Sequence, residues 1–364
     1  MKSSLPKVLH PVCGMPMVGH VLRECESLHP DKIIVVAGSG ADQVRPYVEK
    51  RVEVAIQDPP RGTGHALMQT NALLKNFVGS VVVLCGDAPL IQRSSLEQLV
   101  RLRHESKASA AVLAFGLQNP KGYGRIIRNA EGLAVKIVEE LNATDEQRLI
   151  QEVNSGIYCF QSEKLFSALE RVQPDPIKNE IYLTDVIEYL SRDGEVRVLV
   201  SDNPDQMLGV NSRKDLMKVN QIRNQQNLER LMESGVTVLD DGTVFVGENV
   251  QIGKDTVLYP NTVIDSDCTI GENCHIGPFA HIRSGVVLGN EVTVGNFVEV
   301  TRSTVGNQSR VKHLAYIGDS KIGDRVNVGA GTITANYDGK NKHSSVIEDG
   351  ASIGSGTVLV APTK

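Results

Sequence analysis

The sequence predicts two fold classes in one chain, an α/β domain followed by a parallel β-helix. Up to about Leu231, short runs of β-branched residues alternate with amphipathic stretches, which is typical of strands covered by crossover helices. From Val246 onward, aliphatic residues instead return at every sixth position, a period typical of stacked β-coils. The length of 364 residues suits about two domains.

The first half of the chain contains the expected strands and helices of the α/β domain. Strands are expected at residues 32–37, 52–56, 81–85, 109–114 and 153–160, and helices at 18–28, 64–75, 95–104 and 183–190. A long polar helix, rich in Asn, Gln, Arg and Lys, is expected to open at 210–213 and to run to about residue 233. This helix would connect the two halves.

The second half keeps a six-residue period. Chance would give so long a run of aliphatic residues in on the order of one case in a million. The run consists of Val246, Ile252, Leu258, Ile264, Ile270, Ile276, Ile282, Leu288, Val294 and Val300. Glycine often follows, at residues 247, 253, 271, 277, 289 and 295, where we expect tight corners that need a permissive backbone. Three hexads would close one triangular coil with the aliphatic side chains along its axis.

One segment interrupts this repeat. The phase slips by one residue near Val305 and Ile322, and residues 334–346 leave the pattern altogether. Such interruptions loop out from one face of a solenoid and often bind ligands, so a functional loop is one interpretation. The other is an insertion that the coil tolerates.

Composition and charge exclude several classes of partner. The formal charge is -5, from 38 basic and 43 acidic residues without a basic run, which argues against nucleic acid or an anionic membrane as the main partner. No apolar stretch of about 18 residues and no signal peptide is found, so a cytoplasmic protein is expected. The six cysteines form no C-x-x-C pair, and we expect reduced thiols.

Three short motifs in the α/β half are candidates for chemistry. Leu5-Pro6-Lys7 and Gly62-Thr63-Gly64 each precede a helical segment, and Asp87 follows the expected strand 81–85. Open α/β sheets place ligand groups at this end of a central strand. Taken alone, Asp87 is equally well explained as a turn residue or a helix cap. Gly38-Ser39-Gly40 lacks the third glycine of a dinucleotide fingerprint.

Together these motifs resemble one family over nearly the whole chain. It is the bacterial bifunctional enzyme that is both N-acetylglucosamine-1-phosphate uridylyltransferase and glucosamine-1-phosphate acetyltransferase. The first half contributes LPKVLH at 5–10, GTGHA at 62–66, GDAPL at 86–90, KGYGRI at 121–126, IVEE and ATDEQ within 137–147, EVNSGIY at 152–158 and GVN at 209–211. The second contributes GPFAHIR at 277–283, VGNFVEV at 294–300, KHLAYIGD at 312–319 and VNVGAGTITANYDGKNK at 326–342.

The resemblance implies a domain organisation and a pathway. It implies a Rossmann-like nucleotidyltransferase domain at 1–211, a linker helix at 212–234 and a left-handed β-helix acetyltransferase domain at 235–364. The expected function is UDP-N-acetylglucosamine synthesis. Acetyl-CoA would acetylate glucosamine 1-phosphate, and UTP would then react with N-acetylglucosamine 1-phosphate and release pyrophosphate. Related acyltransferases place the active site between subunits, so a homotrimer is expected.

For uridylyl transfer, the resemblance implies three groups of residues. Asp87 and Asn211 would bind Mg²⁺, which takes few protein oxygens and several waters, and Lys7 would face the phosphates as a point charge. The uracil would be bound by Gln57, Gly62 and Thr63, and the sugar by Gly124, Glu139 and Asn154. The alternatives are a helix-start Lys7, a surface Gln57 and a capping Asn211.

For acetyl transfer, the resemblance implies His313 as the base that takes the proton of the sugar amine. A lone His in a solenoid is otherwise structural more often than catalytic, and the other eight lack a comparable context. Arg283, Tyr316, Asn327 and Lys342 would bind the acceptor, with Arg283 on its phosphate. Acetyl-CoA would be bound by Ala330, Asn336, Tyr337 and Ser355.

The sequence departs from the family in several places. Family members place an apolar strand and a Gly-rich loop before Leu-Pro-Lys, and we expect this chain to lack both. We also expect the last β-helix coils to be missing and acetyl transfer to be weak until they are added. Cys85 stands where Tyr is common. Thr301 stands where the family often has a phosphate-binding Lys, and Arg302 is the candidate to supply that charge instead.

Two other functions fit the architecture. One is a sugar-nucleotide pyrophosphorylase of other specificity that uses the β-helix only for assembly. The other is a non-catalytic regulatory or assembly subunit. The set His313, Asn336 and Tyr337 argues against the first, because a purely structural solenoid has no reason to hold these residues together. The expected lack of the N-terminal Gly-rich loop fits the second.

Overall fold

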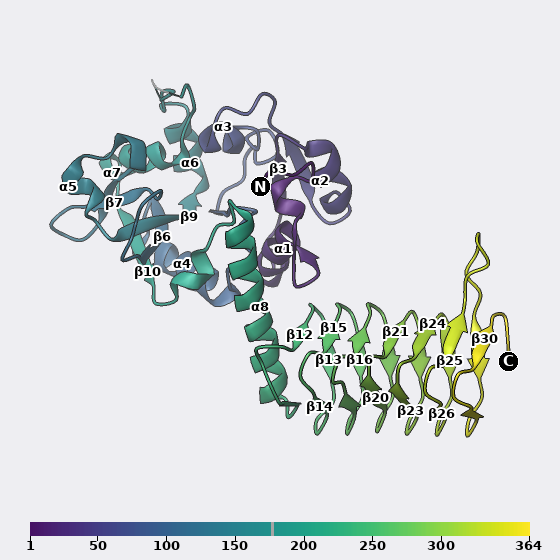
Figure 1. Cartoon of the computed structure of the whole chain (residues 1–364). Helices are drawn as coiled ribbons and strands as arrows, with labels where there is room; N and C mark the ends of the chain where they lie inside the picture. The colour runs from purple at the N-terminus through teal and green to yellow at the C-terminus, as the bar shows by residue number, and fades with distance from the viewer. Residues whose placement is uncertain (176–177) are drawn as a thin grey trace. The chain divides into compact units, whose positions relative to one another are not determined.

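The computed structural model describes residues 1–175 and 178–364, which form two compact units (Figure 1). The first unit holds Met1–His10 and Pro16–Val219, and the second holds Pro11–Met15 and Asn220–Lys364. Within the described residues, no helix is long and apolar enough to cross a membrane.

The first unit is built on a mixed six-stranded sheet. Its order is β10-β6-β9-β7-β8, with β5 also paired to β9, and β3 and β4 form a separate parallel pair. Strand β10 is parallel to β6, whereas β9 is antiparallel to β5, β6 and β7. The strands are β3 (Ile34–Ala37), β4 (Glu53–Ile56), β5 (Ser80–Val83), β6 (Ala110–Gly116), β7 (Arg125–Arg128), β8 (Ala134–Val138), β9 (Glu152–Gln161) and β10 (Val196–Ser201).

Helices cover both faces of this sheet. The helices of this unit are α1 (Met17–Ser27), α2 (Ala41–Val48), α3 (Thr63–Met68), α4 (Arg93–Ser106), α5 (Asp145–Arg148), α6 (Ser162–Leu169) and α7 (Val186–Arg192). Helix α4 packs on one face of the sheet and α6 and α7 on the other, whereas α2 packs against β3 and β4. Strand β6 is buried from Ala110 to Phe115, with alternate residues facing opposite sides. Leu113 and Phe115 pack in one core with Leu96 of α4, whereas Val112 packs in another with Leu190 of α7. The continuous apolar run of β6 is what a strand covered on both faces requires.

The expected strands agree with β3, β4, β5, β6 and β9 to within a few residues. The short strands β7, β8 and β10 were not expected. The helix expected at 64–75 ends at Met68, because the chain continues in turns in which the Thr70 hydroxyl donates to the Leu67 carbonyl at 2.7 Å. The long polar helix is α8 (Arg213–Glu233), as expected.

The second unit is a left-handed parallel β-helix, which Figure 1 shows as a stack of coils from green to yellow. Its first sheet contains β11 (Thr237–Val238), β14 (Val257–Leu258), β17 (His275–Ile276), β20 (Thr293–Asn296), β23 (Arg310–His313), β26 (Asn327–Val328) and β29 (Ser352–Ile353). The second contains β12 (Phe245–Val246), β15 (Val263–Ile264), β18 (His281–Ile282), β21 (Glu299–Thr301), β24 (Tyr316–Gly318), β27 (Ile333–Ala335) and β30 (Val358–Val360). The third contains β13 (Gln251–Ile252), β16 (Thr269–Ile270), β19 (Val287–Leu288), β22 (Thr304–Val305), β25 (Ser320–Ile322) and β28 (Ser345–Ile347).

The six-residue aliphatic series forms the core of this solenoid. Leu258 pairs in register with Ile276, and Ile276 pairs with Val294, all at 0% exposure. Burying each such side chain contributes roughly 1.5–3 kcal/mol. The register then loses one residue: Ile270 pairs with Leu288, but Leu288 pairs with Val305. The slip expected near Val305 is therefore confirmed.

The glycines after the aliphatic residues serve a different purpose from the expected one. Apart from Gly277, with φ 104°, these residues do not adopt the left-handed backbone. A Cβ on Gly247 would lie 2.5 Å from the Ser266 amide nitrogen, and one on Gly295 would lie 2.1 Å from the Lys312 carbonyl oxygen. The glycines are needed because adjacent coils approach closely. The left-handed corners are mostly polar residues such as Asn249.

Candidate functional site

Three polar side chains converge at the strand ends of the first unit. Lys7 comes from a short 3₁₀ helix (Lys7–Leu9), Asp87 follows β5, and Asn211 precedes α8. The Lys7 ammonium forms an ion pair with the Asp87 carboxylate and donates to Asn211 Oδ1 at 2.9 Å. The backbone N–H of Val210 also donates to the Asp87 carbonyl at 3.0 Å, which fixes the approach of the two loops.

This cluster has the donor set that Mg²⁺ requires. A carboxylate and an amide oxygen already face a common cation, the Lys7 ammonium, and both are hard oxygen ligands. Within the described ranges, no group of three or more His, Cys, Asp or Glu side chains is placed to hold a metal. Asp87 and Asn211 could thus hold an ion that takes its remaining ligands from water and substrate phosphates.

The residues expected to bind the sugar also lie together. A Cβ at Gly124 would lie 3.7 Å both from Asn154 Cβ and from Glu139 Oε2, so this glycine leaves space beside the two polar side chains. Asn154 Nδ2 donates to the Tyr158 hydroxyl at 2.6 Å, and the Thr184 hydroxyl donates to Glu139 Oε1 at 2.9 Å. Burial raises the pKa of Tyr158, which keeps its hydroxyl neutral. Sequence reasoning missed Tyr158 and Thr184, although Tyr158 closes the EVNSGIY motif.

The residues expected to bind uracil form a third group. Gln57 is 9% exposed, so the alternative of a surface glutamine is wrong. Its Nε2 donates to the Gly62 carbonyl at 2.9 Å. Gly62 has φ 97°, and a Cβ there would lie 2.5 Å from the Ile181 carbonyl oxygen. The Thr63 hydroxyl accepts from the Leu183 N–H at 3.0 Å. The segment 181–184 therefore contacts both the residues expected to bind uracil and Glu139.

Cys85 packs against Gly156, two residues after Asn154. A Cβ at Gly156 would lie only 2.9 Å from its sulfur, and burial raises the pKa of the Cys85 thiol to about 12. The thiol is a neutral packing group at neutral pH.

In the β-helix, His313 lies at a corner between two sheets. It ends β23, and Tyr316 begins β24 on the next sheet. The Gly331 N–H donates to the His313 carbonyl at 3.2 Å, which brings Ala330 beside it in the next coil. The Gly356 N–H donates to the Ala330 carbonyl at 2.8 Å, which does the same for Ser355. His313, Ala330 and Ser355 therefore follow one corner through three coils.

A second polar network lies across the sheet of β24. Arg302 binds Asp319 through two hydrogen bonds, from Nε at 2.7 Å and from Nη2 at 2.8 Å. Asn336 Nδ2 donates to the same carboxylate. The Arg302 guanidinium beside Asp319 holds the pKa of that carboxyl below its usual range, with smaller contributions from Asn336 and Lys342. Sequence reasoning missed Asp319, although it ends the KHLAYIGD motif.

The interruption expected at 334–346 is shorter in the structure, because Thr334 and Ala335 remain in β27 and Ser345 and Val346 remain in β28. Residues 336–344 leave the stack as a hairpin (Figure 1). Tyr337 forms an isolated bridge with Lys342, and its hydroxyl donates to the Gly339 carbonyl at 2.7 Å. Asp338 accepts from the backbone N–H groups of residues 340 and 341 and lies 2.7 Å from His343 Nε2. The loop is thus internally braced, and it presents Tyr337 at 61% exposure.

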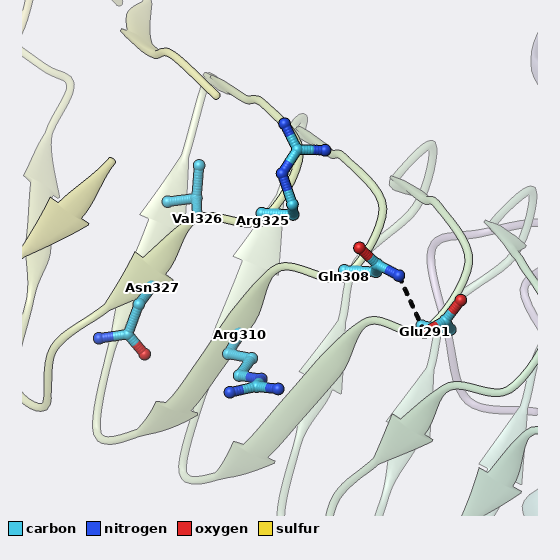
Figure 2. A pocket seen from close by; sticks show the side chains of 6 residues that line it. All are labelled: Glu291, Gln308, Arg310, Arg325, Val326 and Asn327. Atoms are coloured by element: carbon cyan, nitrogen blue, oxygen red, sulfur yellow. Dashed lines mark hydrogen bonds between the residues drawn. The ribbon is translucent and has the colours of Figure 1, made fainter. Parts of the chain in front are cut away.

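The structure does not bring all the expected acceptor residues together. Arg283 and Tyr316 lie on the sheet of β18 and β24, where Arg283 donates to Glu299 at 3.1 Å. Asn327 lies on a different sheet. It lines a hollow of about 380 Å³. Figure 2 shows the side chains around this hollow. The hollow is lined by Glu291, Gln308, Arg310, Arg325, Val326 and Asn327.

The chain is similar to known proteins over its whole length. Residues 2–220 match the family model of nucleotidyl transferases, and residues 267–302 match that of the bacterial transferase hexapeptide, six repeats. The bifunctional protein GlmU of Pelotomaculum thermopropionicum is 43% identical over 100% of this chain and 87% of the relative. That of Geobacillus thermodenitrificans is 42% identical over 100% of this chain and 86% of the relative.

Solved structures agree with the fold of the first unit. The crystal structure of an apo UDP-glucose pyrophosphorylase covers 61% of this chain and 92% of its own, with a TM-score of 0.52 and 16% identity. This likeness shows the fold alone, whereas the sequence identity to the GlmU proteins and the two matching family models show the family. The chain belongs to the family of bifunctional GlmU proteins, transferases of UDP-N-acetylglucosamine synthesis that catalyse both acetyl transfer and uridylyl transfer.

Proposed function

We propose that the two reactions use two separate groups of residues, one in each unit. Residues 1–211 act as the uridylyltransferase domain, 212–234 as the linker and 235–364 as the acetyltransferase domain. The observation that carries the first site is the convergence of Lys7, Asp87 and Asn211. The observation that carries the second is the corner formed by His313, Ala330 and Ser355.

In the first site, a phosphate oxygen of N-acetylglucosamine 1-phosphate attacks the α-phosphorus of UTP. A P–O bond forms as the bond to the leaving pyrophosphate breaks. Bound Mg²⁺ would neutralise charge on the transferring phosphoryl group, with Asp87 and Asn211 as its protein ligands. Lys7 adds a positive charge beside the phosphates, Gln57, Gly62 and Thr63 hold the uracil, and Gly124, Glu139 and Asn154 hold the sugar.

In the second site, the amine of glucosamine 1-phosphate attacks the thioester carbonyl carbon of acetyl-CoA. A C–N bond forms, the C–S bond breaks, and the coenzyme leaves as its thiolate. His313 accepts the amine proton, which lets the nitrogen keep a lone pair for the attack. Arg283, Tyr316, Asn327 and Lys342 bind the acceptor, and Ala330, Asn336, Tyr337 and Ser355 bind acetyl-CoA.

We further propose that the chain forms a homotrimer in which copies of the β-helix share the acetyl-transfer site. Phe279, Phe297 and Leu314 occupy one corner of successive coils, at 47%, 59% and 64% exposure. All three adopt positive φ, a conformation that costs an L-residue roughly 1–2 kcal/mol. A second copy covering this apolar corner would offset that cost. It would also explain why Asn327 lies on a different sheet from Tyr316.

We place the reactions in the cytoplasm, and the six cysteines, all free, fit a reducing compartment. Separate assays test the two sites. Pyrophosphate release from UTP and N-acetylglucosamine 1-phosphate should require Mg²⁺ and stop on chelation. Free thiol release from acetyl-CoA and glucosamine 1-phosphate should continue in the chelator. Equal loss of both activities in the chelator would contradict separate sites.

A further inference from the structure

Asp319 connects two side chains, those of Arg302 and Asn336, at the proposed acetyl-transfer site. It lies in a left-handed corner, with φ 51°, and its N–H donates to the Thr301 carbonyl at 3.1 Å. Its carboxylate accepts the fork of Arg302 and the amide N–H of Asn336. The third guanidinium nitrogen of Arg302 donates to Thr301 Oγ1 at 3.0 Å. Every nitrogen of Arg302 is therefore engaged within the chain.

This arrangement decides how Arg302 acts. Thr301, at the position after Val300, is only 2% exposed. The neighbouring Arg302 forms a bidentate ion pair with Asp319. Such fork-to-carboxylate pairs are geometrically rigid and stronger than neutral hydrogen bonds. An approaching phosphate would have to compete with Asp319 for the guanidinium. Arg302 thus stabilises the carboxylate rather than offering a free charge.

The same arrangement decides the orientation of Asn336. This side chain is 7% exposed, and its Nδ2 faces the carboxylate. The reversed amide would place its oxygen against the carboxylate, where two acceptors repel each other. Asn336 Oδ1 therefore points away from Asp319, and no described side chain or backbone group donates to it. It is an acceptor held ready for a ligand.

We infer that Asp319 is a positioning residue that makes Asn336 present a hydrogen-bond acceptor to an N–H group of a bound substrate. The inference rests on the proposed acetyl-transfer site. Two substrates carry such a group: the pantetheine amides of acetyl-CoA and the amine of glucosamine 1-phosphate. The Tyr316 hydroxyl belongs to the same cluster, since a Cβ at Gly318 would lie 2.6 Å from it and from Asn336 Nδ2.

The test compares Asp319→Asn with the wild-type full chain and with Asp324→Asn as a matched control. An asparagine side chain has one acceptor oxygen, whereas Arg302 and Asn336 together donate to both oxygens of the Asp319 carboxylate. Asp324 is also a corner carboxylate, which accepts from the Asn307 N–H at 2.7 Å, but it contacts neither Asn336 nor Arg302. Steady-state acetyl transfer gives KM for each substrate, calorimetry gives acetyl-CoA binding, and thermal unfolding reports folding.

We expect Asp319→Asn to raise KM for one substrate about ten- to a hundredfold, as loss of a hydrogen bond to a charged group implies, and to leave the other KM within about twofold. The affected substrate identifies the N–H donor. The exchange variant Asp319→Asn/Asn336→Asp again pairs an amide donor with a carboxylate and presents an oxygen, so it should recover most of the loss.

Two results would overturn the inference. One is a folded Asp319→Asn protein with both KM values equal to those of Asp324→Asn. The other is a folded exchange variant that recovers nothing. If wild-type protein neither binds acetyl-CoA nor transfers its acetyl group, the proposed function of the second site fails, and the inference fails with it.

Discussion

The two units assemble their polar side chains in different ways. In the α/β unit, Lys7, Asp87 and Asn211 are far apart in the sequence and meet because their loops lie at one end of a sheet. In the β-helix, Ala330 follows His313 and Ser355 follows Ala330 because each coil lies directly on the one before. At the sheet edge, the connections between strands bring together residues that are far apart in the sequence. In the solenoid, the register of stacked coils brings together residues at equivalent positions. The residues gathered at the first site all come from one chain, whereas the second site should depend on neighbouring copies.

The largest expected effect is at the β-helix corner formed by His313, Ala330 and Ser355. His313→Gln should lower kcat of acetyl transfer about 10²–10⁴-fold, because loss of the general base leaves the amine proton without an acceptor. Uridylyl transfer should stay unchanged. His275→Gln is the matched control, since His275 is another exposed histidine of the same sheet. Full acetyl transfer by His313→Gln would remove His313 from the mechanism.

The corresponding change at the sheet edge is Asp87→Asn. The amide keeps an oxygen but loses the charge that attracts the metal and Lys7, so pyrophosphate release should fall about 10²–10³-fold. Acetyl transfer should be untouched. Asp145→Asn controls for a lost carboxylate, because the Asp145 side chain is 99% exposed and pairs only with Arg148 among the described residues. Equal turnover by the two variants would rule out Asp87 as a ligand.

A third change tests whether only one site needs other copies. Phe297→Asn replaces an exposed aromatic residue with the residue type found at the same corner at Asn261, which tolerates positive φ. Light scattering should show the trimer dissociating at concentrations at least about tenfold higher than for wild type, with acetyl transfer lost as monomer appears. Uridylyl transfer should persist in the monomer. An unchanged dissociation constant would remove this corner from the interface.

The smallest expected effect is on stability against pH. Arg302 holds the pKa of Asp319 below its ordinary value, so the pair stabilises the fold above the unfolded pKa of about 3.9. That stabilisation is lost as the pH falls through the lower, folded-state pKa. The difference in Tm between wild type and Asp319→Asn should therefore be largest near neutral pH and vanish in acid. A difference that grows in acid would have the wrong sign.

The sequence predicted the architecture better than the details of each site. The six-residue period gave the β-helix and its buried residues directly, because only inward-facing positions must be aliphatic. The motifs also named the side chains that meet around Glu139 and Asn154. Partners such as Thr184 were not predicted, because contacts across distant loops leave no periodic signal. Asp319 was missed for a related reason: in a solenoid corner, a carboxylate looks the same in sequence whether it caps a turn or orients an amide.

Two independent sites on one chain are tested most directly by mixing the two inactive variants. Given glucosamine 1-phosphate, acetyl-CoA, UTP and Mg²⁺, neither Asp87→Asn nor His313→Gln alone should make appreciable UDP-N-acetylglucosamine. An equal mixture should make it, because N-acetylglucosamine 1-phosphate formed by one variant diffuses to the other. Full product formation by either variant alone, or none from the mixture, would contradict the account.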